Sequence, residues 1–157
     1  MWKKKGISLV PIKYSHNYFG TKYNVQIAVY HDDGSVAVSH SGIEMGQGIN
    51  TKVCQVVARE LGVAMDMVSV KQTNNLTNPN RSVTGGSMGS ECNCSVSDAI
   101  VLEMHIFKHH ISQAAVIACD KLKAKMKPIR DEMSEPDWPS LVKRRFMAGV
   151  DLTSRHM

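Results

Sequence analysis

Apolar and polar residues alternate in the first half of the chain, which is the pattern of a half-buried β-strand. Residues 22–30, KYNVQIAVY, alternate in this way, and residues 35–40, SVAVSH, form a second apolar run. The segment between them, HDDGS at 31–35, contains an Asp-Gly pair that favours a tight turn. We therefore predict a β-hairpin. The apolar residues of its first strand share one face: Tyr23, Val25, Ile27 and Val29.

Two further β-type runs flank this hairpin. The first is GISLVPIKYS at residues 6–15, in which Pro11 has no backbone N–H and limits the run to a sheet edge or a bulge. The second is a short strand expected at residues 67–73, MVSVKQT.

The spacing of apolar residues becomes helical in three segments. Residues 49–61 and 114–126 each carry an apolar stripe, and Gly62 suits the position just after the first of these helices. Asp137 suits the N-cap of a third helix at residues 138–148. The order of hairpin, helix, strand, Gly-rich loop and C-terminal helices is typical of an α+β domain.

Composition bounds this picture. With 157 residues, of which 43% are hydrophobic and 21% charged, the chain suits one globular domain. No run approaches the roughly 18 consecutive apolar residues of a membrane span, and the N-terminus does not resemble a signal peptide. The four cysteines, in a sequence without a secretory signal, favour reduced thiols and a cytoplasmic location.

The net charge of +5 is concentrated in residues 3–5, 121–130 and 143–145. Basic clusters of this kind bind nucleic acid in some proteins. Here only 6% of the residues are aromatic, and there is no zinc-finger spacing. Solvated helix faces explain the charge better, so we expect neither a nucleic acid nor a membrane as partner.

Two glycine-rich loops carry the strongest candidate chemistry. The first, GIEMGQGINTK at 42–52, enters the helix predicted at 49–61, and the second, TGGSMGS at 84–90, precedes a possible helix start. Glycines let backbone N–H groups face a ligand, and the free N–H groups and dipole of a helix start favour an anion. Gln47 adds an amide that both donates and accepts hydrogen bonds. The two loops suggest a sandwich around one flat, polar, anionic ligand.

Spacing alone leaves two other interpretations open. Both loops fit ordinary turns and helix caps, since neither contains the Gly-Lys-Ser/Thr of a Walker motif or a GxGxxG sequence. An unrelated α+β module with two anion-binding loops also fits.

The motifs themselves are more specific than their spacing. The sequence resembles the molybdenum-cofactor domain of the xanthine dehydrogenase and aldehyde oxidase family, the molybdenum hydroxylases, and the TGGS run looks closer to aldehyde oxidases. The matching stretches are WKKKGISLVPIKY at 2–14, DDGSVAVSHSGIEMGQGINTKVCQVVARELG at 32–62, TNPNRSVTGGSMGSE at 77–91, ACDKLKAKMKPIR at 118–130 and the tail at 138–152.

The resemblance implies that the chain is part of a larger molybdenum-cofactor domain and supplies two loops to a molybdenum–molybdopterin cofactor. The family hydroxylates aldehydes or N-heterocycles, which are small-molecule substrates. Its general base lies in a different motif from Glu44, so Glu44 is expected to have a structural role. The matching positions imply six cofactor contacts and no metal ligand: Met45, Gly46, Gln47, Gly85, Gly86 and Ser87.

Other parts of the family's machinery have no counterpart in this sequence. It contains neither a Cys pattern for a [2Fe–2S] cluster, nor an FAD domain, nor the loop that carries the base. We therefore expect a fragment that begins within a domain, since Trp2 follows the initiator Met directly, and that is inactive alone. The [2Fe–2S] cluster, FAD, the rest of the hydroxylase chain and a homodimer are expected only at full length. The alternative is a non-catalytic truncated or pseudogene product with residual cofactor binding.

Residues 96–113, VSDAIVLEMHIFKHHISQ, do not fit the resemblance. Their removal restores the family spacing, and 18 residues correspond to 18 × 3 = 54 nucleotides in frame. The first two residues are compatible with GTA-AGT and the last with CAG, so we hypothesise a translated short intron. A genuine insertion is one alternative. A metal site on His105, His109 and His110 is another, although no pattern supplies a fourth ligand.

Overall fold

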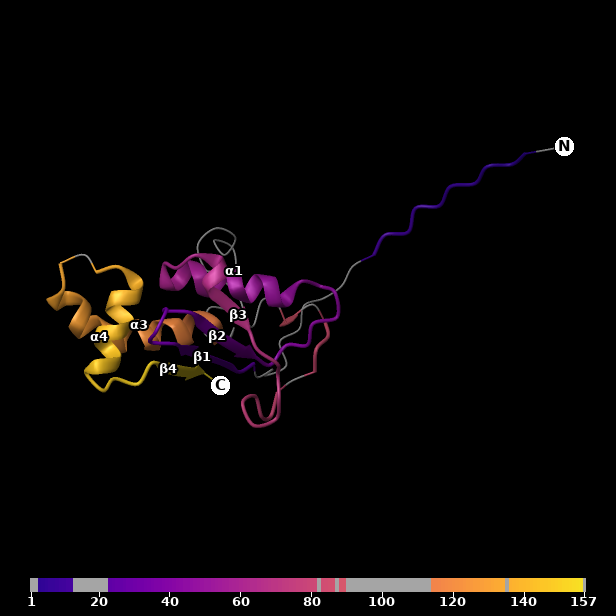
Figure 1. Cartoon of the computed structure of the whole chain (residues 1–157). Coiled ribbons are helices and arrows are strands. Elements are labelled where there is room, and N and C mark those ends of the chain that lie inside the picture. The colour runs from indigo at the N-terminus through magenta and orange to yellow at the C-terminus, as the bar shows by residue number, and fades with distance from the viewer. Residues whose placement is uncertain are drawn as a thin grey trace, which may run out of the picture.

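The computed structural model describes residues 3–12, 23–81, 83–86, 88–89, 114–134 and 136–156. Their helices and strands form a mixed α+β fold, as predicted (Figure 1). The strands are β1 (Val25–Val29), β2 (Val36–His40), β3 (Val68–Val70) and β4 (Thr153–His156). The helices are α1 (Ile49–Leu61), α3 (Ala114–Glu132) and α4 (Trp138–Met147), and a short 3-10 helix, η1, spans Met65–Met67.

The four strands form one sheet in the order β3-β2-β1-β4. The predicted hairpin is confirmed, because β1 and β2 pair antiparallel from Val29 with Val36 to Val25 with His40. At the turn, Ser35 N–H donates to Asp33 Oδ1 at 2.8 Å. The strand β3 runs parallel to β2, and β4 antiparallel to β1. In this order β2 is an interior strand, with β3 on one side and β1 on the other. The loop that follows β2 therefore leaves the middle of the sheet and not an edge.

A helical layer of α1 and α3 covers the sheet (Figure 1). Full burial of one aliphatic side chain contributes about 1.5–3 kcal/mol, so the apolar stripes of these helices contribute to the stability of the fold together with the buried strand residues. Every residue of the predicted stripes is buried, and Ala58 and Ala114 are buried as well. The buried residues of each helix follow. Those of α1 are Ile49, Val53, Val56, Val57, Ala58 and Leu61, and those of α3 are Ala114, Ala115, Ala118, Cys119, Leu122 and Met126.

The last helix, α4, packs against the hairpin turn. Trp138 Nε1–H donates to the carbonyl oxygen of Gly34 at 2.7 Å. The rings of His31 and Phe146 stack with centroids 3.8 Å apart. Asp137 stands at the N-cap, where the sequence predicts it. These two contacts join the hairpin turn to α4, more than 100 residues later in the chain.

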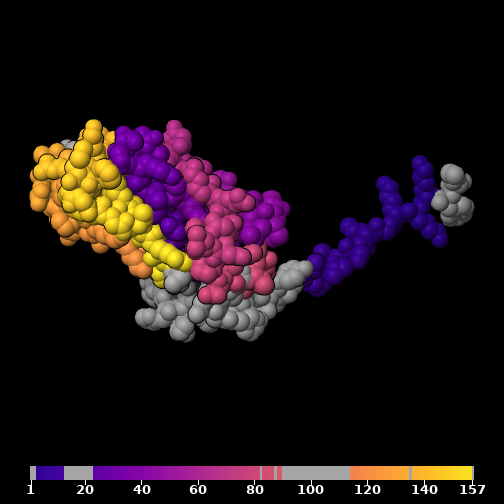
Figure 2. Space-filling model, turned by 60° about the horizontal axis from the view of Figure 1, so that its bottom comes forward, coloured from indigo at the N-terminus to yellow at the C-terminus, as the bar shows by residue number. Residues whose placement is uncertain are grey.

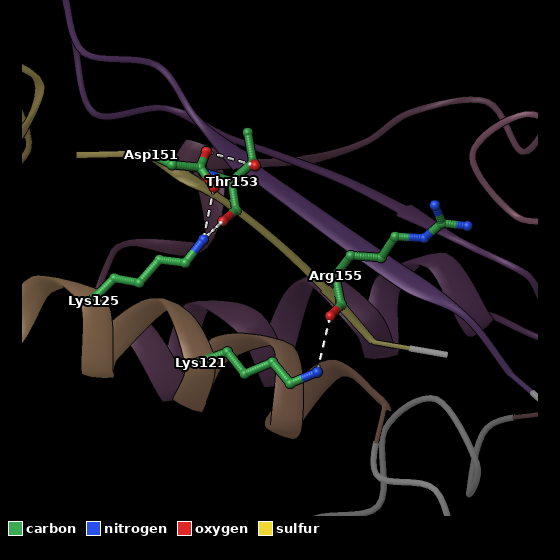
Figure 3. Close-up of polar contacts among 5 residues, drawn as sticks. All are labelled: Lys121, Lys125, Asp151, Thr153 and Arg155. Atoms are coloured by element: carbon green, nitrogen blue, oxygen red, sulfur yellow. Dashed lines mark hydrogen bonds and ion pairs between the residues drawn. The ribbon is translucent and has the colours of Figure 1, made fainter. Parts of the chain in front are cut away.

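The edge strand β4 is held to α3 by two lysines one helical turn apart (Figure 3). Lys121 Nζ donates to the Arg155 carbonyl oxygen at 3.1 Å, and Lys125 Nζ donates to the Thr153 carbonyl oxygen at 2.7 Å. Lys125 also forms an ion pair with Asp151 at 2.7 Å. The sequence did not predict this strand, because TSRH lacks an apolar run.

Three predicted elements differ from the structure. The strand predicted at 67–73 is confined to Val68–Val70. Residues 6–12, the described part of the run predicted at 6–15, form no strand and extend away from the body (Figures 1 and 2). No described strand pairs with this segment, and without a partner its backbone gains no ladder hydrogen bonds. The helix predicted at 114–126 continues to Glu132 despite Pro128, because Ile129 and Met133 still pack against the core.

Some sequence-based predictions lie outside the described residues. These include the segment 96–113 with its three histidines, and Ser87 in the second glycine loop. Within the described part of the chain, no helix combines the length and apolar composition needed to cross a bilayer.

Candidate functional site

Glu44 organises the first glycine loop. Its Oε1 accepts hydrogen bonds from the backbone N–H groups of Gly46 and Gly48, both at 2.9 Å. Its Oε2 accepts from Asn50 N–H, in the first turn of α1, at 3.0 Å. The bond from Asn50, followed by those from the glycines, holds the pKa of Glu44 below its usual value. The carboxylate therefore stays charged and acts as an internal cap for loop and helix.

This arrangement corrects one expectation. The N–H groups at the start of α1 were expected to be free for an external anion, whereas Glu44 already supplies a negative charge there. It accepts from one N–H group of the first turn, that of Asn50, and from two of the preceding loop, those of Gly46 and Gly48. An external ligand here meets a neutralised helix start. The structural role expected for Glu44 agrees with this geometry.

Gln47 is folded back onto its own loop. Its Oε1 accepts from Met45 N–H at 2.5 Å, and its Nε2 donates to the Ile43 carbonyl oxygen at 2.6 Å. An amide has two N–H hydrogens and two oxygen lone pairs. Within the described residues, one hydrogen and one lone pair of the exposed Gln47 amide therefore remain for a ligand.

Backbone geometry explains the glycines of this loop. Gly46 has φ of 98° and Gly48 has φ of 77°, a region that residues with a Cβ rarely adopt. Apart from chain neighbours, nothing would lie within 4 Å of a Cβ at either position. The loop thus presents bare backbone to open space, next to Met45, whose side chain is 68% exposed.

The second glycine loop is tied to the first. Ile43 N–H donates to Thr84 Oγ1 at 3.1 Å, across 41 residues of sequence. Gly85 and Gly86 follow directly and are exposed, and Gly86 has φ of 62°. Met88 and Gly89 are helical, as expected of a helix start. The structure therefore brings together five of the six predicted contact positions on two adjoining loops.

The Asn-rich segment that precedes the second loop, residues 74–80, is bonded to one end of the sheet, where β2 ends and β1 begins. Asn78 is 1% exposed, and its Nδ2 donates to Ser39 Oγ of β2 at 2.7 Å. Asn24 Nδ2 donates to the Pro79 carbonyl oxygen at 2.6 Å. These side-chain bonds hold residues 74–80 against β1 and β2, and they fix where the second loop begins.

His40 was missed by the sequence analysis. It ends β2, is fully buried, and its Nδ1 accepts from Gly42 N–H at 3.2 Å. The proton must then be on Nε2, which donates to Asn50 Oδ1 at 2.8 Å. Burial lowers the pKa of His40 and favours this neutral form. In the sequence, the sign of a role for His40 is its place at the polar end of an apolar strand.

A shallow cleft of about 340 Å³ lies on one side of the first loop. None of the predicted contacts Met45, Gly46, Gln47, Gly85 and Gly86 is among the residues around it. The described residues that line it are Gly42, Ile43, Glu44, Asn50, Val70, Lys71, Gln72 and Thr73. The exposed glycine loops, rather than this cleft, are the surface that the motifs single out.

The two thiols among the described residues do not supply a reactive group. Cys119 is buried, and burial raises its pKa to about 12, so the thiol stays protonated. Burial also raises the pKa of Cys54. No group of three His, Cys, Asp or Glu side chains suited to a metal ion occurs in the described ranges.

Comparison with known families tests the resemblance that the sequence motifs suggest. Residues 1–156 match the family model of the molybdopterin cofactor-binding domain. The chain belongs to this family. The match confirms the family resemblance and the class of cofactor predicted from the sequence, and it excludes an unrelated module.

Curated relatives of this family are oxidoreductases. Aldehyde oxidase 3 of Rattus norvegicus is 34% identical over 155 residues, which is 98% of this chain and 10% of the relative. Xanthine dehydrogenase of Drosophila pseudoobscura pseudoobscura is 32% identical over 157 residues, again 98% of this chain and 10% of the relative. The chain therefore spans about a tenth of the length of these curated relatives.

Solved structures show the same fold. A CO dehydrogenase from Oligotropha carboxidovorans aligns with a TM-score of 0.63 at 19% identity, covering 87% of this chain and 18% of that one. A quinoline 2-oxidoreductase from Pseudomonas putida 86 aligns with a TM-score of 0.57 at 16% identity, covering 87% and 19%. In both, the fold corresponds to a minor part of a larger chain.

Proposed function

We propose that this chain supplies two loops, residues 42–48 and 84–87, to the molybdenum–molybdopterin site of an oxidoreductase that hydroxylates aldehydes or N-heterocycles. The contacts would be Met45, Gly46 and Gln47 on one loop, and Gly85, Gly86 and Ser87 on the other. The observation that carries the proposal is the bond between Ile43 and Thr84, which joins two open glycine loops into one surface.

The chemistry of this surface suits a pterin cofactor. A pterin ring is flat and polar, with donors and acceptors along its edge, and the spare hydrogen and lone pair of Gln47 complement such an edge. The open backbone at Gly46 and Gly85 allows close approach without a Cβ in the way. When bound, the cofactor supplies the two-electron chemistry of the family. The residues of this chain bind and orient it.

Retention of the cofactor tests the proposal. We would express the chain in a host that makes molybdopterin, and measure the pterin and molybdenum that co-purify. Gln47→Ala removes the spare donor and acceptor, and Gly86→Val adds a side chain at positive φ. Each should lower retained pterin by about tenfold, the effect of losing one well-placed hydrogen bond or of comparable strain.

Gln55→Ala is the matched control, because Gln55 is also an exposed glutamine but lies on α1 away from both loops. It should retain pterin like the parent chain. Equal retention in Gln47→Ala and Gln55→Ala would contradict the proposal.

We further propose that activity belongs to a longer protein, because the family's base, [2Fe–2S] and FAD elements have no counterpart in this sequence. The cofactor-loaded chain alone should not oxidise an aldehyde or an N-heterocycle. Turnover of either by the purified 157-residue chain would refute this.

We propose that residues 96–113 are a translated short intron. Sequencing of the transcript should find messages that lack the 54 nucleotides. Their presence in every message would favour a genuine insertion.

A further inference from the structure

The first glycine loop is fixed by side chains that are not among the proposed cofactor contacts. Glu44 binds three backbone N–H groups of the loop and of α1. Two of these groups, those of Gly46 and Gly48, belong to residues at positive φ on either side of Gln47. A short loop with two such residues has several alternative conformations when unrestrained. Glu44 therefore stabilises the loop conformation in which the Gln47 amide folds back.

His40 connects this loop to the sheet. Its ring accepts from Gly42 N–H and donates to Asn50 Oδ1, so it joins the end of β2 to the first turn of α1. Asn50 in turn donates its backbone N–H to Glu44 Oε2 at 3.0 Å. The carbonyl oxygen of His40 accepts from Thr73 Oγ1 at 2.6 Å, which anchors the residue itself.

The three side chains thus form one continuous network. It runs from the buried ring of His40, through Asn50, to the exposed carboxylate of Glu44 and the two glycines. His40 is 0% exposed and ends a paired strand, so it is a rigid origin for the network. Sites that bind cofactors tolerate only small displacements, and supporting side chains of this kind set the accuracy of the contact.

We propose that His40, Asn50 and Glu44 are positioning residues that preset the Gln47 loop for its cofactor before the cofactor arrives. This inference rests on the proposed function. It assigns no chemical step to the three residues, and it places the cost of ordering the loop in folding rather than in binding.

Hydrogen exchange followed by mass spectrometry tests the network in the cofactor-free chain. Glu44→Gln keeps the size of the side chain but turns one acceptor oxygen into an NH₂ donor, which faces backbone N–H groups. Exchange at Gly46, Gly48 and Asn50 should become about tenfold faster, while the last turn of α1 keeps its rate. Glu132→Gln, an exposed carboxylate at the end of α3, is the control and should change neither.

A pair of substitutions at His40 separates hydrogen bonding from packing. His40→Leu removes both bonds of the ring and should speed exchange across residues 42–50. His40→Gln retains one acceptor and one donor, and it should restore much of the protection. Equal exchange in both variants would overturn the role assigned to His40.

Cofactor retention then separates a positioning role from a merely structural one. Glu44→Gln should retain about tenfold less pterin, although its melting temperature stays within a few degrees of the parent. Faster exchange with unchanged retention would overturn the inference, and so would unchanged exchange. A parent chain that retains no pterin would instead refute the proposed function, whatever the exchange data show.

Discussion

Individual residues decide the shape of the cofactor loop. The sequence analysis predicted Met45, Gly46 and Gln47 from a family resemblance, and the structure adds the hydrogen bonds that give the loop its form. His40 and Asn50 could not be predicted as its supports, because their contact depends on where β2 ends relative to α1. The motif points to exposed candidate contacts, whereas it does not point to the residues that hold their loop in place.

The buried ring of His40 makes stability depend on pH. Burial lowers its pKa from the usual 6.5, so the unfolded chain takes up the proton more readily than the folded chain. The nearby Glu44 charge opposes this shift only in part. The contribution of the neutral His40 ring to the free energy of unfolding is complete above about pH 6.5 and is lost as the pH falls below that value.

We therefore expect the melting temperature to fall from about pH 7.5 to about pH 5.5, and to fall less in His40→Gln. His31→Gln provides the comparison, because His31 is partly exposed and lies at the hairpin turn. The loss of pH dependence in His40→Gln should exceed any loss in His31→Gln. Equal pH dependence in the parent and in His40→Gln would contradict the prediction.

The helices and strands follow from local sequence wherever burial has a clear period. The stripe of α1 predicted its bounds, and the Asp-Gly pair predicted the turn between β1 and β2. The strand β4 was not predictable, since side chains from α3 hold it in place. The failure at residues 6–12, the described part of the run predicted at 6–15, has the opposite cause: a suitable sequence without a pairing strand among the described residues.

The junction between α4 and the hairpin should depend on the small size of Gly34. A Cβ there would lie 2.8 Å from Trp138 Cδ1 and 2.9 Å from Nε1, and φ is +75°. Gly34→Ala should destabilise the fold by about 2–3 kcal/mol, through steric overlap and backbone strain together.

Gly62→Ala isolates the backbone part of this effect. Gly62 has φ of +70°, but nothing lies within 4 Å of its Cβ position. Gly62→Ala should lower the free energy of unfolding by about 1 kcal/mol. Urea unfolding followed by tryptophan fluorescence measures both variants, and equal losses would show that the overlap with Trp138 is relieved without cost.

The lysine contacts of β4 should contribute modestly. Lys125→Ala removes the ion pair with Asp151 and the bond to the Thr153 carbonyl oxygen, with an expected loss of about 0.5–1 kcal/mol. Lys127→Ala, an exposed neighbour for which no contact is found in the described part of the chain, should cost less. Urea unfolding compares the two.

Acid weakens the same contact. Lys125, together with Thr153, lowers the pKa of Asp151 to about 2. The contribution of the ionised Asp151 to stability is therefore complete above about pH 4 and is lost between about pH 4 and about pH 2. The difference in stability between Lys125→Ala and the parent should shrink over this range. A constant difference down to about pH 2 would show that the ion pair adds nothing.

At the scale of the whole molecule, the chain is much shorter than the curated relatives that it matches. It spans about a tenth of its curated relatives. Its residues 3–12 present bare apolar side chains, with Ile7 103% and Leu9 95% exposed (Figures 1 and 2). Contiguous apolar surface of this kind in an extended segment favours association with other chains.

We expect the purified chain to self-associate as its concentration rises. Ile7→Lys combined with Leu9→Lys should reduce this association, because it breaks the apolar run with charge. Leu76→Lys, which changes a single exposed leucine in a turn, should not. Sedimentation velocity over a concentration series distinguishes the outcomes, and a parent chain that stays monomeric throughout would contradict the prediction.

The most direct test of the account is hydrogen exchange in the chain with and without its cofactor, purified from hosts that do and do not make molybdopterin. We predict slower exchange in the cofactor-containing chain at residues 42–48 and 83–86 together, and no change at residues 70–73 along the neighbouring cleft. Retained cofactor with unchanged exchange in both glycine loops would show that it binds elsewhere, and would contradict the central claim.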